Sequence, residues 1–411
     1  MTDRLNSTPK GTLQPERKDS FRDQLAPLLL LTSIFFVNFL ARIILAPLMP
    51  SVESDMAINH AEAGSFFLLI SMGYFITLLC SGFISSRITH QKTIILSNVA
   101  LGLALLFTAF TASLGGMRLG VLMLGLAAGP YIPSGIATFT TLINSRHWGK
   151  AIAIHELAPN LGFVLAPLIS EAVLFWFSWR AVFVALGIIA LLLAGVFARF
   201  GRGGEFHGES AGYASFSKIL ATPMFWIMVV LFSLGIGSTL GIYTMLPLYL
   251  VAEHGMERNW ANTLIALSRI ASVGITLIGG WATDHFGPKR ILRIVFLLTG
   301  LMTMFIGLAP SAWITAAVFL QPIMAVCFFP AGIAALSMIS SSKERNIAVS
   351  LTVPIAFLIG GGAAPTLIGF IGDAGSFGSG IAFVGGAVLT GTFFSGLLKF
   401  SAQSESNLIK L

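Results

Sequence analysis

Long apolar runs, separated by short polar stretches, fill almost the whole chain. A helix needs about 20 mainly apolar residues to cross a membrane. Twelve runs reach that length, and a polar segment at 201–222 separates the first six from the last six. The runs cover 26–49, 63–84, 93–113, 119–142, 150–174, 180–200, 223–250, 261–282, 291–309, 312–339, 346–371 and 378–398. The pattern predicts an all-α membrane protein with twelve transmembrane helices.

The polar stretches divide this predicted protein into five parts. We expect two six-helix bundles, joined by a flexible connector and flanked by two tails. In chain order they are an N-terminal tail 1–25, a bundle 26–200, a connector 201–222, a bundle 223–398 and a C-terminal tail 399–411.

Composition supports a lipid environment. Hydrophobic residues make up 55% of the chain and charged residues only 10%, whereas a soluble domain carries about 25% charged residues. A soluble enzyme is therefore excluded. No metal-ligand cluster, phosphate loop or catalytic triad occurs in the sequence, so we expect no enzymatic activity, no cofactor and no metal site.

The basic residues indicate how the chain crosses the membrane. Of the 24 Lys and Arg residues, 19 lie in the tails, in the connector or in loops on the same side as the termini. Only Arg118, Arg180 and Arg258 lie in loops on the other side. Because cytoplasmic loops are enriched in Lys and Arg, we predict an inner-membrane protein with both termini in the cytoplasm. The net charge of +7 then reflects topology, and no nucleic-acid partner is expected.

The two halves of the chain repeat each other. The segment LAPLMPSVESDM at 45–56 aligns with MLPLYLVAEHGM at 245–256, and GFISSRITHQK at 82–92 aligns with GWATDHFGPKR at 280–290. Two parallel six-helix repeats are typical of transporters that rock their halves around a site near the middle of the membrane.

The segment GWATDHFGPKR has the form G-x-x-x-D-x-x-G-x-K-R and follows the eighth predicted helix. It resembles the signature loop of the major facilitator superfamily, and the W-R-x-x-F run that begins at Trp179 is also similar to that family. The resemblance implies the major facilitator fold, with two six-helix pseudo-repeats. In the first copy of the loop Ser86 replaces the acidic residue, so we expect a weaker latch there. The expected gating loop comprises Gly280, Asp284, Gly287, Lys289 and Arg290, in which the carboxylate pairs with the cations or with a helix N-terminus.

Further motifs resemble the organic-anion branches of this superfamily. Asn38 and Arg42 match the N-Y-x-D-R run of the anion:cation symporters, with Ala41 at the acidic position. Asn160-Leu161-Gly162 is similar to the N-x-G of nitrate-type members, and Arg269 lies where monocarboxylate- and nitrate-type members place their substrate arginine. The helix 5 motif of drug/proton antiporters is missing. The resemblance implies an anion transporter.

Two arginines within the predicted spans need a physical reason. A charged side chain near the middle of the bilayer costs about 2.5–3.5 kcal/mol on insertion scales, and arginine does not lose its proton. The guanidinium fork suits a carboxylate, so we predict that Arg269 and Arg42 bind the substrate. A structural ion pair is the alternative for Arg269, and snorkelling to the outer interface is the alternative for Arg42. With Glu156 as the only plausible deep carboxylate, one positive charge remains for an anion to neutralise.

Glu156 and His155 are the candidate proton carriers, because a carboxylate and an imidazole can titrate as water access alternates. Pairing with Arg146 or Lys150 near the headgroups is an equal alternative. Ala41 leaves uniport or anion exchange open. Other polar groups on predicted cavity helices could hydrogen-bond the substrate. These secondary candidates are Asn38, Tyr74, Asn160, Tyr243 and Gln321.

These observations predict a secondary active transporter for a small organic anion, with a carboxylate as the expected substrate and a proton as the coupling ion. The protein would work as a monomer in membrane lipid. The alternatives are a proton-driven exporter of drugs or other hydrophobic compounds, and a non-transporting sensor built on the same fold. The short connector and tail argue against the sensor.

Overall fold

The computed structural model describes residues 21–208, 218–339 and 345–400. Most of both predicted tails and the middle of the predicted connector lie outside these residues. Over the described residues the secondary structure is helical, and twelve helices or helix pairs are long and apolar enough to cross a membrane. The predicted all-α, twelve-span fold is confirmed.

The first six spans run from Gln24–Met56 to Trp179–Phe200. Their helices are α1 (Phe21–Ile43), α2 (Leu45–Met56), α3 (His60–Ile88), α4 (His90–Phe110), α5 (Leu114–Ala128), α6 (Tyr131–Leu142), η1 (Ser145–His147), α7 (Trp148–His155), α8 (Leu157–Leu174) and α9 (Trp179–Phe200).

The other six spans run from Pro223–Ala252 to Phe377–Gly396. Their helices are α11 (Pro223–Ile236), η2 (Gly237–Gly241), α12 (Ile242–Ala252), α13 (Arg258–Phe286), α14 (Pro288–Leu308), α15 (Ser311–Ala325), α16 (Phe328–Met338), α17 (Arg345–Ala356), η3 (Phe357–Ala363), α18 (Ala364–Ala374) and α19 (Phe377–Gly396).

Three spans of each half are interrupted, and they are the corresponding ones: the first, fourth and fifth of the first half, and the first, fourth and fifth of the second. Proline explains four of the six interruptions, because it cannot donate to the carbonyl four residues earlier. Pro47, Pro133, Pro159 and Pro330 each follow a break by about one turn. The other two breaks are the π-helical segments η2 and η3. Interrupted helices at matching positions of two repeats are the usual location of a transporter's binding site.

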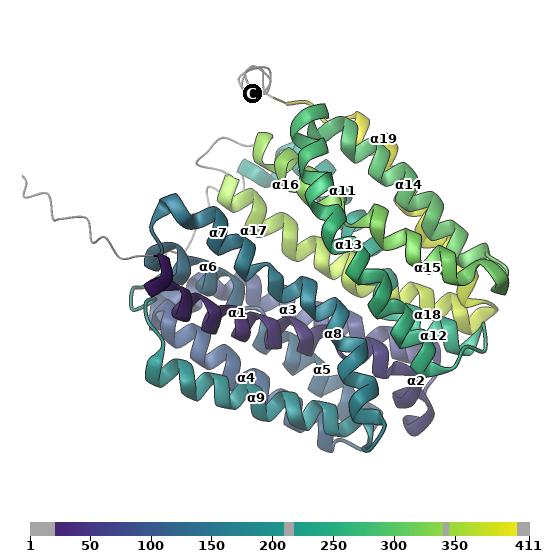
Figure 1. Ribbon diagram of the computed structural model, residues 1–411, viewed down its shortest axis with the longest axis horizontal. Helices are drawn as coiled ribbons and strands as arrows, with labels where there is room; N and C mark the ends of the chain where they lie inside the picture. Colours follow the sequence, from purple (N-terminus) through teal and green to yellow (C-terminus); the bar gives the residue numbers. More distant parts are fainter. Residues whose placement is uncertain (1–20, 209–217, 340–344, 401–411) are drawn as a thin grey trace, which may run out of the picture.

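Figure 1 shows the two halves side by side, the first in purple to teal and the second in green to yellow. Contacts between them are made by α2 with α12, by α3 with α18 and η3, and by α8 with α13. The end of the molecule formed by residues 57–59, 175–178, 253–257 and 375–376 is called the outer end below, following the topology that the sequence predicts.

The two signature loops share one backbone shape. Thr89 and Gly287 each end one helix and begin the next, with φ of 81° and 79°. The described part of the connector binds the first loop, since the backbone N–H groups of His90 and Gln91 donate to the carbonyls of Phe206 and Gly204. The start of the connector is therefore held against the first half.

Candidate functional site

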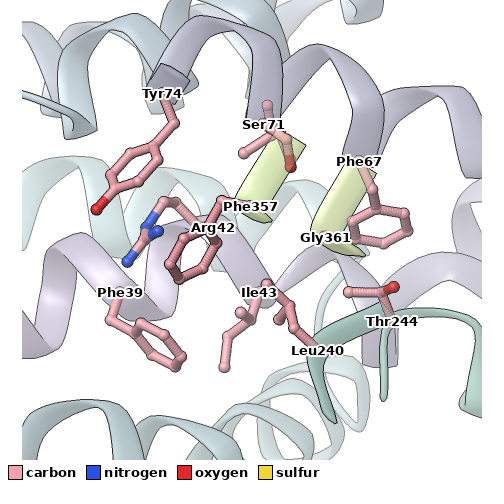
Figure 2. Close-up of a pocket in the computed structure, with 11 residues that line it drawn as sticks. Phe39, Arg42, Ile43, Phe67, Ser71, Tyr74, Leu240, Thr244, Phe357 and Gly361 are labelled. Carbon is pink, nitrogen blue, oxygen red and sulfur yellow. The ribbon is translucent and has the colours of Figure 1, made fainter. Parts of the chain in front are cut away.

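Arg42 lies in the last turn of α1, buried within an aromatic cage. Its guanidinium carbon is 4.3 Å from the ring centroid of Tyr74, 5.1 Å from that of Phe39 and 5.6 Å from that of Phe357. The side chain opens onto a small cavity between the halves, whose lining residues Figure 2 shows. The cavity volume is about 20 Å³, the space of one or two water molecules. The buried Nε of Arg42 has no hydrogen-bond partner.

Arg269 occupies the middle of α13 and is equally buried. One terminal nitrogen donates to the carbonyl of Thr239 at 3.1 Å. That carbonyl lies in η2, where the widened π-turn changes the local hydrogen bonding of the helix. The guanidinium carbon is 4.8 Å from the ring centroid of Phe163 and 5.0 Å from that of Tyr243. As in Arg42, the buried Nε has no partner.

An aromatic pair connects the two arginine environments. The rings of Phe39 on α1 and Phe163 on α8 pack edge to face with centroids 5.1 Å apart. Phe163 also packs edge to face on Tyr243 at 4.8 Å, and its carbonyl accepts a hydrogen bond from the Tyr243 hydroxyl at 3.3 Å. The two cages therefore meet along one aromatic seam between the halves.

Within the described residues, no carboxylate pairs with these two charges. The buried side chains there include both arginines but no Asp or Glu, and the described ion pairs contain neither arginine. Glu156, which we expected to offset one of the charges, has a side chain 55% exposed and lies beside His155. Within the described part of the chain, two buried positive charges therefore lack a carboxylate partner, rather than the one that the sequence indicated.

His155 is the buried member of the predicted proton pair. Its ring stacks on Phe35 with centroids 4.4 Å apart, and its Nε2 is 3.2 Å from the hydroxyl oxygen of Tyr131. That hydroxyl donates to the carbonyl of Leu31, so it can accept a hydrogen bond from the imidazole. The Nδ1 of His155 is 3.7 Å from Oε1 of Glu156. A buried imidazole thus contacts an exposed carboxylate.

Three of the secondary candidates support the helix breaks. The side-chain amide of Asn38 donates to the carbonyl of Ala128, next to the break between α5 and α6. Asn160 donates to the carbonyl of Glu156 at the break before α8, and Gln321 donates to the carbonyl of Ser238 in η2. Contact of these amides with a substrate stays a prediction. Tyr74 and Tyr243, by contrast, lie directly beside the arginines.

The predicted gating loop lies at the opposite end from the outer end. Lys289 donates to the carbonyl of Leu398 at 2.7 Å, and the Arg290 guanidinium lies 5.9 Å from the Phe286 ring centroid. Asp284 is exposed, and no ion pair described for residues 21–208, 218–339 and 345–400 includes it. Pairing of Asp284 in another conformation, as a latch requires, stays a prediction.

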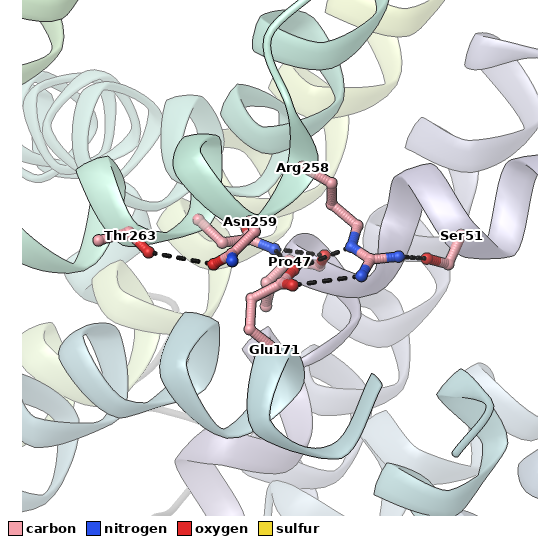
Figure 3. Close-up of polar contacts among 7 residues, drawn as sticks. Pro47, Ser51, Glu171, Arg258, Asn259 and Thr263 are labelled. Atoms are coloured by element: carbon pink, nitrogen blue, oxygen red, sulfur yellow. Dashed lines mark hydrogen bonds and ion pairs between the residues drawn. The ribbon is translucent and has the colours of Figure 1, made fainter. Parts of the chain in front are cut away.

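The outer end contains a polar network between the halves that the sequence did not reveal (Figure 3). Arg258 on α13 donates to both carboxylate oxygens of Glu171 on α8 at 3.0 and 3.2 Å, and to the hydroxyl of Ser51 at 3.2 Å. Asn262 donates to the same carboxylate at 2.6 Å and to the carbonyl of Pro47 at 3.1 Å. The sequence places Arg258 in a predicted outer loop, and nothing in it indicates that this arginine meets Glu171.

A second contact joins the halves at the outer end, between α3 and α18. The carboxylate of Asp373 on α18 accepts hydrogen bonds from the backbone N–H groups of His60 and Ala61 at the start of α3, at 3.0 and 2.8 Å. Behind it, Gly64 and Gly369 let α3 and α18 approach so closely that an added Cβ would lie 2.7 and 2.2 Å from backbone oxygens of the facing helix. Both seams therefore hold the halves together at the outer end.

Comparison with known proteins identifies the family. The sequence pattern of the Major Facilitator Superfamily matches residues 31–282 and 259–408. A probable L-galactonate transporter of Escherichia coli K12 is 22% identical, with 89% of this chain and 86% of that protein covered. A probable nitrate/nitrite transporter NarK2 of Mycobacterium tuberculosis is 25% identical over 74% of this chain and 78% of its own length. The multidrug resistance protein MdtL of Klebsiella pneumoniae is 20% identical over 62% and 66%.

Solved structures agree on the fold. A bacterial homologue of the human lysosomal transporter Spinster, in an inward-facing and unoccupied conformation, superposes with a TM-score of 0.75 at 17% identity. The superposition covers 94% of this chain and 98% of that one. The nucleoside transporter NupG superposes with a TM-score of 0.73 at 13% identity, covering 91% of this chain and all of that one. The chain belongs to the major facilitator superfamily and is a multi-pass membrane transporter of small substrates.

Proposed function

We propose that this protein transports a small organic anion, a carboxylate, across the inner membrane by alternating access, with both termini in the cytoplasm and the monomer as the working unit. One observation carries the proposal. Two arginines, Arg42 from the first half and Arg269 from the second, are buried at the seam between the halves, and no described residue supplies a carboxylate partner. The names of the L-galactonate and nitrate/nitrite transporters among the relatives are consistent with an anionic substrate.

The physical argument concerns the cost of these charges. A guanidinium away from water needs compensation, and the aromatic faces around Arg42 and Arg269 supply only part of it. A carboxylate can accept two parallel hydrogen bonds from one guanidinium, including one from the Nε that now lacks a partner. A cationic substrate would add a third positive charge to the same region. The site therefore favours an anion over the lipophilic cations that many drug exporters carry.

The position of the contacts between the halves supports alternating access. The Arg258–Glu171 network and the Asp373 contact hold the outer end closed. These contacts must break for the site to open outward, and the interrupted helices beside the arginines can bend as this happens. Phe163 of the first half packs on Tyr243 of the second half, across the seam that has to open.

Proton symport is the coupling mode that we propose. Glu156 is exposed and lies next to the buried His155, so a proton taken up by the carboxylate has a short path to the imidazole. Uniport and anion exchange remain the alternatives, since Ala41 occupies the acidic position expected from the symporter resemblance. The relatives named as MdtL support the other function class, the drug exporter.

Thermal stability of the purified protein in detergent tests the proposal. A ligand that binds only the folded state raises the melting temperature as its site fills. We expect small carboxylates to raise the melting temperature of the wild type more than that of Arg269→Met. Arg199→Met is the matched control, because Arg199 is exposed at the end of α9, and it should respond as the wild type does. Stabilisation by lipophilic cations alone, unchanged in Arg269→Met, would overturn the proposal in favour of an exporter.

A further inference from the structure

The number of unneutralised charges specifies the substrate more closely. The buried side chains of the described residues carry two guanidiniums and no carboxylate. Glu171, with a side chain 14% exposed, is already bound by Arg258, and Glu156 is exposed. A bound monocarboxylate would neutralise one of the two central charges and leave the other as costly as before.

The two arginines occupy separate cages. Tyr74, Phe39 and Phe357 surround Arg42, whereas Phe163 and Tyr243 surround Arg269, and no ring belongs to both sets. The edge-to-face rings of Phe39 and Phe163 lie where the two cages meet. Each guanidinium also keeps its own unpartnered Nε. The two guanidiniums therefore offer two separate sets of donors to a ligand.

The cavity beside Arg42 is too small for a whole organic anion. Its volume is about 20 Å³, and it holds two buried donors without partners, the Nε of Arg42 and the hydroxyl of Tyr74. Figure 2 shows the Tyr74 hydroxyl and the Arg42 guanidinium close to each other along this cavity. Two convergent donors are the usual partners of one carboxylate. Phe39 and Phe163 lie between this cavity and Arg269, so a ligand that reaches both arginines passes these two rings.

We infer that the substrate carries two anionic groups, as an α,ω-dicarboxylate does, with one carboxylate bound by Arg42 and Tyr74 and the other by Arg269. The spacer between the carboxylates packs against Phe39 and Phe163, so it is short and largely apolar. This inference rests on the proposed transport of an organic anion and narrows its substrate class.

Matched ligands separate one binding charge from two. Succinate, glutarate and adipate, each with its monomethyl ester, keep nearly the same shape but differ by one carboxylate charge. At pH 7.5, where free carboxyl groups are ionised, their affinities for the purified protein would be measured by calorimetry. We expect at least one dicarboxylate to bind about tenfold more tightly than its ester, the gain of one charge-assisted hydrogen-bonded pair.

Substitution of one arginine should remove this preference. In Arg42→Gln the dicarboxylate and its ester should bind with affinities within about twofold of each other, because only Arg269 is left to bind an anion. Arg269→Gln gives the same test from the other half, so the experiment does not depend on the folding of one variant. Arg199→Gln, at the exposed end of α9, should keep the wild-type ratio.

Three outcomes are distinguishable. A dicarboxylate preference that disappears in the arginine variants supports the inference. Equal binding of acids and esters by the wild type, with loss of both in the variants, would overturn the inference and leave the proposed anion transport standing. Binding of lipophilic cations alone would overturn both.

Discussion

The arginines at the outer end and those at the centre have opposite surroundings. Arg258 donates to both oxygens of Glu171, and Arg180 donates to Asp55 while lying over the ring of Trp179. Arg42 and Arg269 have aromatic rings around them and an Nε without a partner. An arginine that joins two elements has a counter-charge within the protein. An arginine without one, kept where burial is costly, is available to a ligand.

The paired and the unpaired arginines should also differ in how they affect the stability of the fold. Removing one partner of a buried pair leaves the other charge uncompensated and destabilises the fold. Removing an unpaired buried charge relieves a cost and stabilises the empty protein, as is common at binding sites. Substitutions at the two places should therefore change stability in opposite directions.

The largest effect is expected from the central arginines. Arg42→Met or Arg269→Met should lower carboxylate uptake into proteoliposomes about 100-fold, since each variant loses a charge-assisted pair of up to about 3 kcal/mol. Radiolabelled uptake at equal reconstituted protein measures this, with Arg199→Met as control. Uptake at more than half the wild-type rate in both central variants would contradict a role of Arg42 and Arg269 in substrate binding.

The next effect concerns the outer end. Arg258→Met leaves the carboxylate of Glu171 with Asn262 as its remaining side-chain donor, so we expect a loss of about 1–3 kcal/mol in stability. Because the side chain of Arg258 is 37% exposed, solvent screening places the loss at the low end of that range. The melting temperature of Arg258→Met should fall, and that of Arg258→Met with Glu171→Gln should recover in part. A double variant no more stable than the single one would show that the pair does not act as a unit.

A smaller effect is expected where the pair is open to solvent. Asp55 and Arg180 have side chains 46% and 31% exposed. Exposed ion pairs contribute at most about 1 kcal/mol. The indole N–H of Trp179 also donates to the Asp55 carboxylate at 3.1 Å, and it can donate to an amide oxygen at the same place. Asp55→Asn should therefore lower the melting temperature only slightly. A fall as large as that of Arg258→Met would contradict the ranking by burial.

The smallest effect on binding is expected at Glu156. Its carboxylate touches neither central arginine, so Glu156→Gln should change carboxylate affinity by less than about twofold. Carboxylate uptake by the Glu156→Gln variant should instead become less dependent on an inward proton gradient. Affinity and uptake measured on the same preparation separate the two effects. A tenfold gain in affinity would mean that Glu156 competes with the substrate for the arginines.

The spans and the four proline-linked breaks were accessible from the sequence, because apolar length and proline act locally. Pro47 and Pro159 mark interruptions that the structure contains. The alignment of the two signature loops also indicated that they correspond. It did not indicate that Thr89 adopts in the first loop the positive φ that Gly287 adopts in the second. The two central arginines were likewise found from their cost in a membrane.

Partners distant in sequence were not accessible. Phe39 and Phe163 are ordinary apolar residues in apolar helices, and only the packing of α1 on α8 makes them the seam between two cages. Glu171 and Arg258 each looked like a polar residue near a helix end. Their pairing depends on how the two halves dock, which no local pattern encodes. The sequence thus supplied the charges, and the packing supplied what surrounds them.

The most direct test of the account is the melting temperature of Arg42→Met and Arg269→Met, alone and with saturating carboxylate. If these charges bind an anion, both variants melt at or above the wild-type temperature without ligand, and the carboxylate raises their melting temperatures less than that of the wild type. If the arginines are structural, both melt well below the wild type without ligand, and the carboxylate raises their melting temperatures as much as that of the wild type.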